Sequence, residues 1–387
     1  MYGAQLIQAL RRIDPSLAFF GVGGEKIRAV GCDTVVDAKE LAVVGITEIL
    51  SHLPKIWRLF RQLVAEADKR KPDLAIVIDS PAFNWRVARQ MKKRGVPVVY
   101  YVCPQFWAWR QGRVRLLRKY VDKALVIFPF EEKFYRDRGV DAEFVGHPLA
   151  ELARPAISRE EYATVNGLVA SKPWITLMPG SRVKEVRMNL PTILQAAGRL
   201  GADYEFLLPV AHTIDAGFIR HVVDSHPSTF TKDSAASKDK RKENVRIHLV
   251  PESLPALAHS RAAIVASGTA TVEAALMETP FLMVYRVTGL TYLLGRSTVK
   301  VPYFAMVNLI AGEQIVPELV QQDFTAERVV GELNKIIPDG AARQSMLNGL
   351  RRVRNLLRGD SKKTNPIDRA AAAALNAVRG RAAAQIR

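Results

Sequence analysis

The chain has 387 residues, of which 48% are hydrophobic, and its formal net charge is +18. This length predicts about two globular domains, and no apolar run approaches the roughly 20 residues that span a bilayer. Two cysteines, Cys32 and Cys103, give neither a disulfide framework nor a metal-binding spacing. We therefore expect a reduced, cytoplasmic setting, and the positive charge favours anionic partners: nucleic acid, acidic lipid or phosphorylated substrates.

In chain order, the first distinctive element is a basic amphipathic stretch over residues 51–71. Arg58 and other basic residues lie there among apolar residues at helical spacing, namely Leu53, Ile56, Trp57, Phe60, Leu63 and Val64. This pattern is typical of a helix that binds an anionic membrane surface. It is equally typical of a core helix with a solvated basic face.

Short apolar runs that alternate with helical patterns follow along the whole chain, and they predict parallel strands joined by helices. The first series comprises residues 18–21, 74–78, 98–102, 124–128 and 143–145, and the second 175–178, 205–208, 246–250, 262–266 and 281–285. The fold class expected is α/β, with two doubly wound Rossmann-like domains over residues 1–155 and 156–344. A basic helical tail, 345–387, follows them, and the polar segment 224–244 predicts a mobile insertion.

Ligands of doubly wound sheets bind beyond the carboxyl ends of the strands, so the loops there are the candidate sites. Asp79 follows an apolar run in a proline-stiffened turn, where a carboxylate can accept a proton from a substrate hydroxyl. Capping of the next helix is the alternative for this residue. His147 is either a second acid or base or, preferably, a hinge histidine bonded to backbone.

A second loop of the first half is rich in aromatic residues. Its members Phe106, Trp107 and Trp109 fall within four residues and precede Arg110. Aromatic faces suit sugar rings or acyl chains and arginine suits phosphate, although a purely structural aromatic plug has the same composition.

In the second half, two strand-turn-helix segments predict a nucleotide site. Phosphate oxygens are expected from Ser267 to Thr271, a turn that includes Gly268, Thr269 and Ala270, and Glu273 can bind paired ribose hydroxyls. An ordinary turn whose glutamate favours the helix N-terminus is the alternative. The turn Gly180, Ser181 and Arg182 places a guanidinium where it can neutralise a departing diphosphate. The chain has no Asp-x-Asp pair and no histidine spacing for a metal, so we expect no metal dependence.

Seven runs, in this order and spacing, resemble those of lipid-A-disaccharide synthase: residues 40–46, 78–84, 104–110, 144–148, 179–182, 267–273 and 308–312. The resemblance covers nearly the whole chain. It implies a glycosyltransferase of the GT-B type that needs no cofactor. The implied reaction joins UDP-2,3-diacylglucosamine to 2,3-diacylglucosamine 1-phosphate with inversion, giving the β-1,6 disaccharide of lipid A biosynthesis and UDP. The implied location is the cytoplasmic face of the inner membrane, with peripheral attachment.

The resemblance also implies roles by position. Asp79 matches the general base for the acceptor hydroxyl and Arg182 the arginine that faces the donor phosphates. Residues Gly180, Ser181, Ser267, Gly268, Thr269, Ala270, Glu273 and Asn308 match the donor site. The acceptor and membrane surface is expected at Trp57, Arg58, Phe60, Trp107, Trp109 and Arg110. Exchange of C-terminal segments between protomers makes a homodimer an expectation.

Two departures from the family pattern accompany this resemblance. The family begins with a strand and a glycine-rich turn, whereas this chain starts inside that turn, so we expect upstream in-frame codons to encode the missing strand. Ala82 stands where many relatives carry a further acidic residue. The alternatives are a UDP-sugar epimerase of the same architecture and a truncated, inactive UDP-sugar-binding protein. Nucleic acid is not an expected partner because no nucleic-acid-binding signature is present.

Overall fold

A computed structural model describes residues 2–41, 46–230, 245–289, 301–359 and 364–385. The chain divides into two compact units, and each is described by itself. The first comprises Met1–Glu151 together with Leu357–Arg387, and the second is Leu152–Leu356. The segment expected to form a single tail is thus shared between the two units.

The first unit is built on parallel strands. Strands β1 (Phe20–Gly23) and β2 (Asp33–Asp37) pair with each other. A four-stranded sheet follows the chain order β3 (Ala75–Ile78), β4 (Val98–Tyr101), β5 (Lys123–Val126) and β6 (Ala142–Phe144). Strand β2, which is polar at both ends, was not predicted from the sequence.

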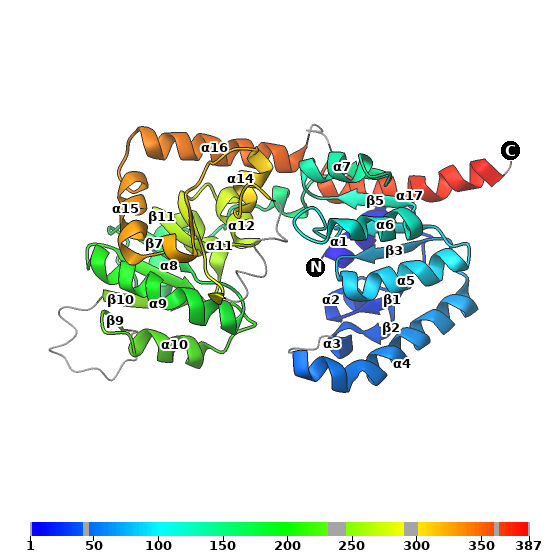
Figure 1. Cartoon of the computed structure of the whole chain (residues 1–387), viewed down its shortest axis with the longest axis horizontal. Helices are drawn as coiled ribbons and strands as arrows, with labels where there is room; N and C mark the ends of the chain where they lie inside the picture. The colour runs from blue at the N-terminus through cyan, green and yellow to red at the C-terminus, as the bar shows by residue number, and fades with distance from the viewer. Residues whose placement is uncertain (1, 42–45, 231–244, 290–300, 360–363, 386–387) are drawn as a thin grey trace. The chain divides into compact units, whose positions relative to one another are not determined.

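Helices cover both faces of the four-stranded sheet (Figure 1). On one face lie α4 (Ile46–Arg70), α5 (Pro81–Lys93) and α6 (Val114–Tyr120), whose buried residues form one core cluster with β3, β4 and β5. On the other face, α1 (Tyr2–Ile13) packs against α17 (Pro366–Gln385). The remaining helices are α2 (Glu25–Ala29), α3 (Ala38–Leu41), α7 (Pro129–Arg136) and the 3-10 turns η1 (Gln111–Arg113) and η2 (Pro148–Glu151).

Small side chains explain how closely α1 and α17 pack. Helix α17 buries Pro366 and the alanines at positions 370, 371, 373 and 374, and α1 buries Ala4 and Ala9 together with Leu6 and Leu10. The start of α17 is capped by Asn365, because the backbone N–H of Asp368 donates to Asn365 Oδ1 at 2.8 Å.

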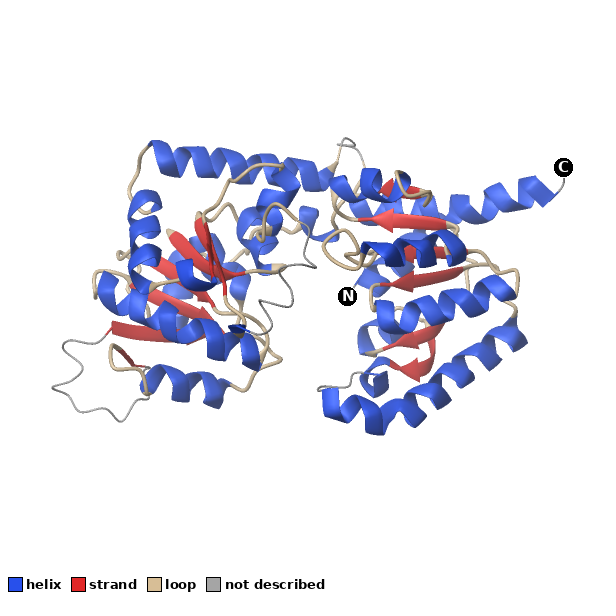
Figure 2. Cartoon of the chain, viewed as in Figure 1, coloured by secondary structure: helices blue, strands red, loops and turns tan. Residues whose placement is uncertain are grey.

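The second unit contains one seven-stranded parallel sheet with the order β13-β12-β11-β7-β8-β10-β9 (Figure 2). The strands are β7 (Trp174–Met178), β8 (Glu205–Pro209), β9 (Thr229–Phe230), β10 (Val245–Val250), β11 (Ala262–Ala266), β12 (Phe281–Tyr285) and β13 (Glu318–Val320). The predicted α/β class is confirmed. The two short edge strands β9 and β13 were missed, and most of the expected insertion, residues 231–244, lies outside the described residues.

The helices of this unit are α8 (Arg159–Asn166), α9 (Val183–Leu200), α10 (Ala216–Asp224), α11 (Ser253–His259), α12 (Ala270–Leu276), α14 (Met306–Ala311), η4 (Gln321–Asp323), α15 (Ala326–Ile336) and α16 (Ala341–Arg358). The order of the strands reverses at β7, because β8 lies on one side of it and β11 on the other. This is the topological switch point of a doubly wound sheet, where ligands bind.

Candidate functional site

Asp79 lies directly beyond the carboxyl end of β3. Its own φ is +48° and that of Ser80 is +43°, so two successive residues without glycine adopt the left-handed region. The side chain of Asp79 is exposed. The N-cap of α5 is Ser80, which makes no side-chain capping bond, so the capping role that the sequence left open for Asp79 is not the one it has.

The aromatic loop after β4 divides into a buried and an exposed part. Trp107 is only 6% exposed, and its Nε1 donates to Glu131 Oε1 at 2.8 Å. The predicted surface position of Trp107 is therefore wrong. Trp109 is 47% exposed, with the guanidinium of Arg110 4.3 Å from its ring centre. These two remain available to an acceptor.

Glu131 was not singled out from the sequence. It is buried in the first turn of α7 and also accepts the backbone N–H groups of Ile127 and Phe128. Burial raises the pKa of Glu131 to about 7 even though these two amides and Trp107 favour the charged form. The one local feature of the sequence that could have drawn attention to Glu131 is its position two residues after Pro129, in the first turn of a helix. That pattern is typical of helix capping.

The amphipathic helix α4 is half core and half surface. Phe60 is 6% exposed and belongs to the core cluster beneath the helix, so its predicted surface position is wrong. Trp57 is 57% exposed and its ring stacks on Phe60 with 5.4 Å between the ring centres. Leu53 and Arg58 are exposed beside it.

The two donor loops predicted in the second unit start next to each other at the switch point. Val265 of β11 pairs with Met178 of β7, so residues 179–182 and 267–270 leave adjacent strands at the same edge. Asn189 of α9 holds the loop 179–182 in place, because its Nδ2 donates to the carbonyl of Pro179 at 2.9 Å.

The loop after β11 offers unpaired backbone donors and a carboxylate. The N–H of Ser267 donates to Val284 and that of Thr271 to Gly268. Within the described part of the chain, the N–H groups of Gly268, Thr269 and Ala270 have no acceptor. In the turn where the sequence predicts phosphate oxygens, the N–H groups of Ser267 and Thr271 are thus already bonded, and these three amides, one of which opens α12, are not.

Glu273 lies in the first turn of α12 and is half-buried. Its Oε2 accepts the hydroxyl of Ser253 at 3.0 Å. Burial raises the pKa of Glu273, and the hydrogen bond from Ser253 lowers it by a smaller amount. Ser253, which starts α11, was not predicted because 20 residues separate it from Glu273.

The loop after β7 carries a charge pair. The side chain of Arg182 is 80% exposed, and its Nη1 lies 2.7 Å from Glu185 Oε1. Glu185 Oε2 accepts the N–H groups of Ser181 and Arg182 at 2.9 and 3.3 Å. Gly180 has a φ of +125°, and a Cβ there would lie 2.6 Å from the Glu185 side chain. Glu185 therefore occupies the amides of Ser181 and Arg182 as well as the guanidinium that the sequence assigned to the diphosphate.

Asn308 is fully buried and all its hydrogen-bonding positions are filled. Its Nδ2 donates to the carbonyl of Val316 and to Glu318 Oε1, and its Oδ1 accepts the N–H groups of Ile315 and Val316. Its amide thus has no group left to offer a donor sugar, contrary to the expectation of direct contact.

Instead, Asn308 supports the nucleotide loop through a chain of bonds. Glu318 Oε2 accepts the N–H of Phe304, and the carbonyl of Phe304 accepts the hydroxyl of Ser267, each at 2.9 Å. Because the bonds are continuous, Asn308 and Glu318 determine where Ser267 lies.

His147 is 2% exposed, and its Nδ1 accepts the N–H of Leu149 at 3.1 Å. Burial lowers the pKa of His147 to about 4, which fits the expected neutral histidine bonded to backbone. Among the described residues, no three His, Cys, Asp or Glu side chains are grouped to hold a metal ion. No helix in the described ranges is both long and apolar enough to cross a bilayer.

A family model described as lipid-A-disaccharide synthetase matches residues 1–367. A lipid-A-disaccharide synthase of Koribacter versatilis (strain Ellin345) is 49% identical over 377 residues, which cover 97% of this chain and 95% of that relative. One of Acidobacterium capsulatum is 46% identical, with 91% of this chain and 88% of the relative covered. The similarity in sequence extends through both units.

Solved structures with a similar fold are more distant in sequence. CalG4, a calicheamicin glycosyltransferase, has a TM-score of 0.58 at 16% identity and covers 98% of this chain and 94% of its own. A UDP-GlcNAc 2-epimerase from Neisseria meningitidis bound to UDP-GlcNAc has a TM-score of 0.58 at 11% identity and covers 97% and 95%. At such identities the likeness concerns the fold alone, which is of the GT-B type.

Proposed function

Because the chain belongs to the lipid-A-disaccharide synthase family, it is a glycosyltransferase of lipid A biosynthesis, and we propose how its residues carry out the transfer. The donor is UDP-2,3-diacylglucosamine and the acceptor is 2,3-diacylglucosamine 1-phosphate. The observation that carries the assignment of the base is the exposed carboxylate of Asp79, which does not cap a helix, at the carboxyl edge of the first sheet.

In this proposal, Asp79 accepts the proton of the acceptor 6-hydroxyl. The oxygen of that hydroxyl attacks C1 of the donor sugar from the face opposite UDP. The new C1–O bond forms as the bond from C1 to the diphosphate oxygen breaks, which inverts the configuration at C1. Trp109 and Arg110, exposed after β4, contact the acceptor sugar and its 1-phosphate.

The donor is bound by the loops at the switch point of the second sheet. The amides of Gly268, Thr269 and Ala270 and the guanidinium of Arg182 stabilise the negative charge that develops on the departing UDP. Glu273 accepts the ribose hydroxyls. Ser267 and Asn308 support this loop through the bonds described above.

The test measures acceptor-dependent release of UDP by the wild type, Asp79→Asn and Arg182→Ala. Asp79→Asn loses about 100-fold or more in kcat and binds UDP as the wild type does. Arg182→Ala binds UDP more weakly. The matched control is Asp73→Asn, an exposed aspartate that precedes the same strand at its other end. Full turnover by Asp79→Asn would end the assignment of the base.

We also propose that the exposed part of α4 binds the anionic cytoplasmic face of the inner membrane. Trp57 and Leu53 are 57% and 49% exposed, and Arg58 lies beside them. Cosedimentation with vesicles of phosphatidylglycerol and phosphatidylethanolamine tests this. Trp57→Ser with Arg58→Glu lowers the bound fraction several-fold, whereas Val165→Ser, at an apolar position 73% exposed in the second unit, does not. Equal vesicle binding by the double variant and by Val165→Ser would contradict the proposal.

A homodimer that exchanges C-terminal segments completes the proposal. Helices α17 and α1 pack against each other, and both bury alanines. The same contact can form between two chains. Light scattering of the purified protein reports the mass, and a monomer at all concentrations would reject the exchange.

A further inference from the structure

The carbonyl of Asp79 is bound by two side chains of the first unit. The hydroxyl of Tyr100 donates to it at 2.7 Å, and Nδ2 of Asn84 donates to it at 2.7 Å and to the carbonyl of Ile78 at 2.8 Å. Tyr100 reaches across from the neighbouring strand β4, and Asn84 reaches back from the first turn of α5. The two donors approach the same oxygen from different elements.

The turn they hold is strained. Asp79 and Ser80 both have positive φ angles, +48° and +43°, although neither is glycine. Each such residue costs on the order of 1 kcal/mol or more and persists only where its surroundings fix it. Since the carbonyl that accepts both bonds joins these two residues, the bonds fix the peptide plane between them. That plane sets the direction in which the Asp79 side chain leaves the backbone.

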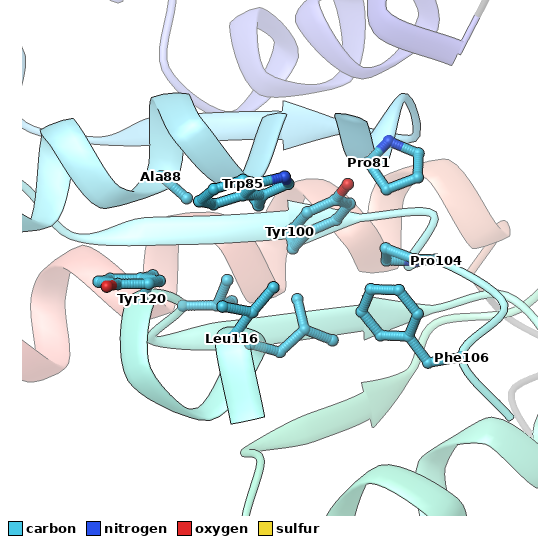
Figure 3. Close-up of a pocket in the computed structure, with 10 residues that line it drawn as sticks. Pro81, Trp85, Ala88, Tyr100, Pro104, Phe106, Leu116 and Tyr120 are labelled. Atoms are coloured by element: carbon cyan, nitrogen blue, oxygen red, sulfur yellow. The ribbon is translucent and has the colours of Figure 1, made fainter. Parts of the chain in front are cut away.

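The hydroxyl of Tyr100 has little choice of partner. Its ring is 1% exposed and borders a cavity of about 10 Å³ lined by Pro81, Trp85, Pro104, Phe106 and other apolar residues (Figure 3). So small and apolar a space offers a water molecule no polar partners. Figure 3 shows the hydroxyl pointing toward the turn at Pro81. Burial raises the pKa of Tyr100, which leaves it a neutral donor.

We propose that Tyr100, assisted by Asn84, is a positioning residue that holds the strained Asp79 turn so that the carboxylate faces the acceptor hydroxyl. The inference rests on the proposed role of Asp79 as the base. Neither residue touches substrate in this account. Both act through the carbonyl of Asp79, so their loss lowers the rate of the chemical step and not the affinity for either substrate.

The experiment compares kcat, acceptor KM and UDP affinity in Tyr100→Phe, Asn84→Ala and the double variant. The matched control is Tyr101→Phe, because the adjacent hydroxyl of Tyr101 is buried without a hydrogen-bond partner among the described residues. Tyr100→Phe lowers kcat about 10- to 100-fold, as a misplaced catalytic group does. Acceptor KM and UDP affinity stay within about threefold. The double variant loses less than the product of the single losses, because both donors serve one oxygen.

Each outcome decides something. If Tyr100→Phe and Asn84→Ala turn over like Tyr101→Phe while Asp79→Asn is inactive, the positioning role is rejected and the base stands. If Asp79→Asn is active, the base is rejected and the positioning role with it. If Tyr100→Phe raises acceptor KM in proportion to its loss of kcat/KM, Tyr100 acts in binding and the proposal also fails. A thermal midpoint matching that of Tyr101→Phe shows that the loss of rate is not loss of fold.

Discussion

The guanidinium of Arg182 and the carboxylate of Glu185 are bonded at 2.7 Å, one turn apart at the start of α9. The cation proposed for the donor diphosphate is therefore paired before any donor arrives. The same carboxylate also accepts the N–H groups of Ser181 and Arg182. A diphosphate and Glu185 compete for the same donors.

Replacement of Glu185 by Gln should therefore tighten UDP binding. The change removes the competing negative charge and keeps a side chain of the same length. We expect the Kd for UDP, measured by calorimetry, to fall about 3- to 10-fold, which corresponds to roughly 1 kcal/mol. Glu332→Gln is the control, because Glu332 forms an ion pair of the same spacing with Lys335 on α15. Weaker binding by Glu185→Gln would mean that Glu185 orients Arg182 for the donor.

Ser253→Ala should move the pH dependence of UDP binding. Burial raises the pKa of Glu273, and the hydroxyl of Ser253 opposes this rise. Without the hydroxyl the pKa rises further. Only the ionised carboxylate accepts from both ribose hydroxyls, so affinity falls as pH falls through the pKa of Glu273, and in the variant the fall begins at a higher pH.

The measurement is the Kd for UDP between about pH 5 and 8. Ser260→Ala is the control, since Ser260 ends the same helix and its hydroxyl bonds Thr176. Profiles of Ser253→Ala and Ser260→Ala that coincide would exclude a role for Ser253 at Glu273.

Glu131 should make the first unit less stable as pH rises. Burial raises its pKa in the fold to about 7, from 4.5 for an ordinary glutamate side chain. Between these two values the folded state binds more protons than the unfolded state, so the free energy of unfolding falls with rising pH and levels off above about 7. The full change is on the order of 3 kcal/mol.

The measurement is the thermal midpoint of the wild type minus that of Glu131→Gln at matched pH. This difference falls from about pH 5 to 7 and is constant above. The control is Glu132→Gln, which alters the neighbouring, half-buried carboxylate that pairs with Arg136 and keeps Glu131. A flat difference for Glu131→Gln would show that Glu131 stays ionised throughout, because its three N–H donors outweigh burial.

Asn308→Ala should weaken the nucleotide loop by removing its support. Two backbone N–H groups and Glu318 lose a buried partner, which costs about 3 kcal/mol or more. We expect a lower thermal midpoint of the second unit and weaker UDP binding, because Ser267 is connected to Asn308 through Glu318 and Phe304. Asn166→Ala, which removes one bond to Tyr162, lowers the midpoint less and leaves UDP binding unchanged. Unaltered UDP affinity in Asn308→Ala would show that the bonds from Asn308 to Ser267 do not affect nucleotide binding.

The parts of the site that the sequence predicted lie on strand-end loops. Asp79 and the turn at Ser267 follow apolar runs directly, and the carboxyl ends of parallel strands share an edge. Their place follows from local pattern and topology. The short strands β9 and β13 have two and three residues, too few to show a period.

The parts that were missed depend on partners distant in sequence. Trp57 and Phe60 share one helical stripe, and Phe60 is the buried one because it packs into the core cluster, with Phe83 edge-on against it. Trp107 is buried because Glu131 accepts its N–H from 24 residues away. Asn308 is the polar residue in the apolar helix Met306–Ala311. Such a residue indicates a buried and fully hydrogen-bonded amide, whereas the resemblance to the family predicted a contact with the donor.

The division of the chain has a consequence for the order in which it folds during synthesis. Every residue of the second unit leaves the ribosome before Leu357, so that unit can complete its sheet on the nascent chain. The first unit is completed later, because α17, which packs against α1, follows the whole second unit in the chain. Until α17 has been synthesised, the part of α1 that packs against it lacks this partner. Helix α1 is therefore packed against α17 only after the whole second unit has been synthesised.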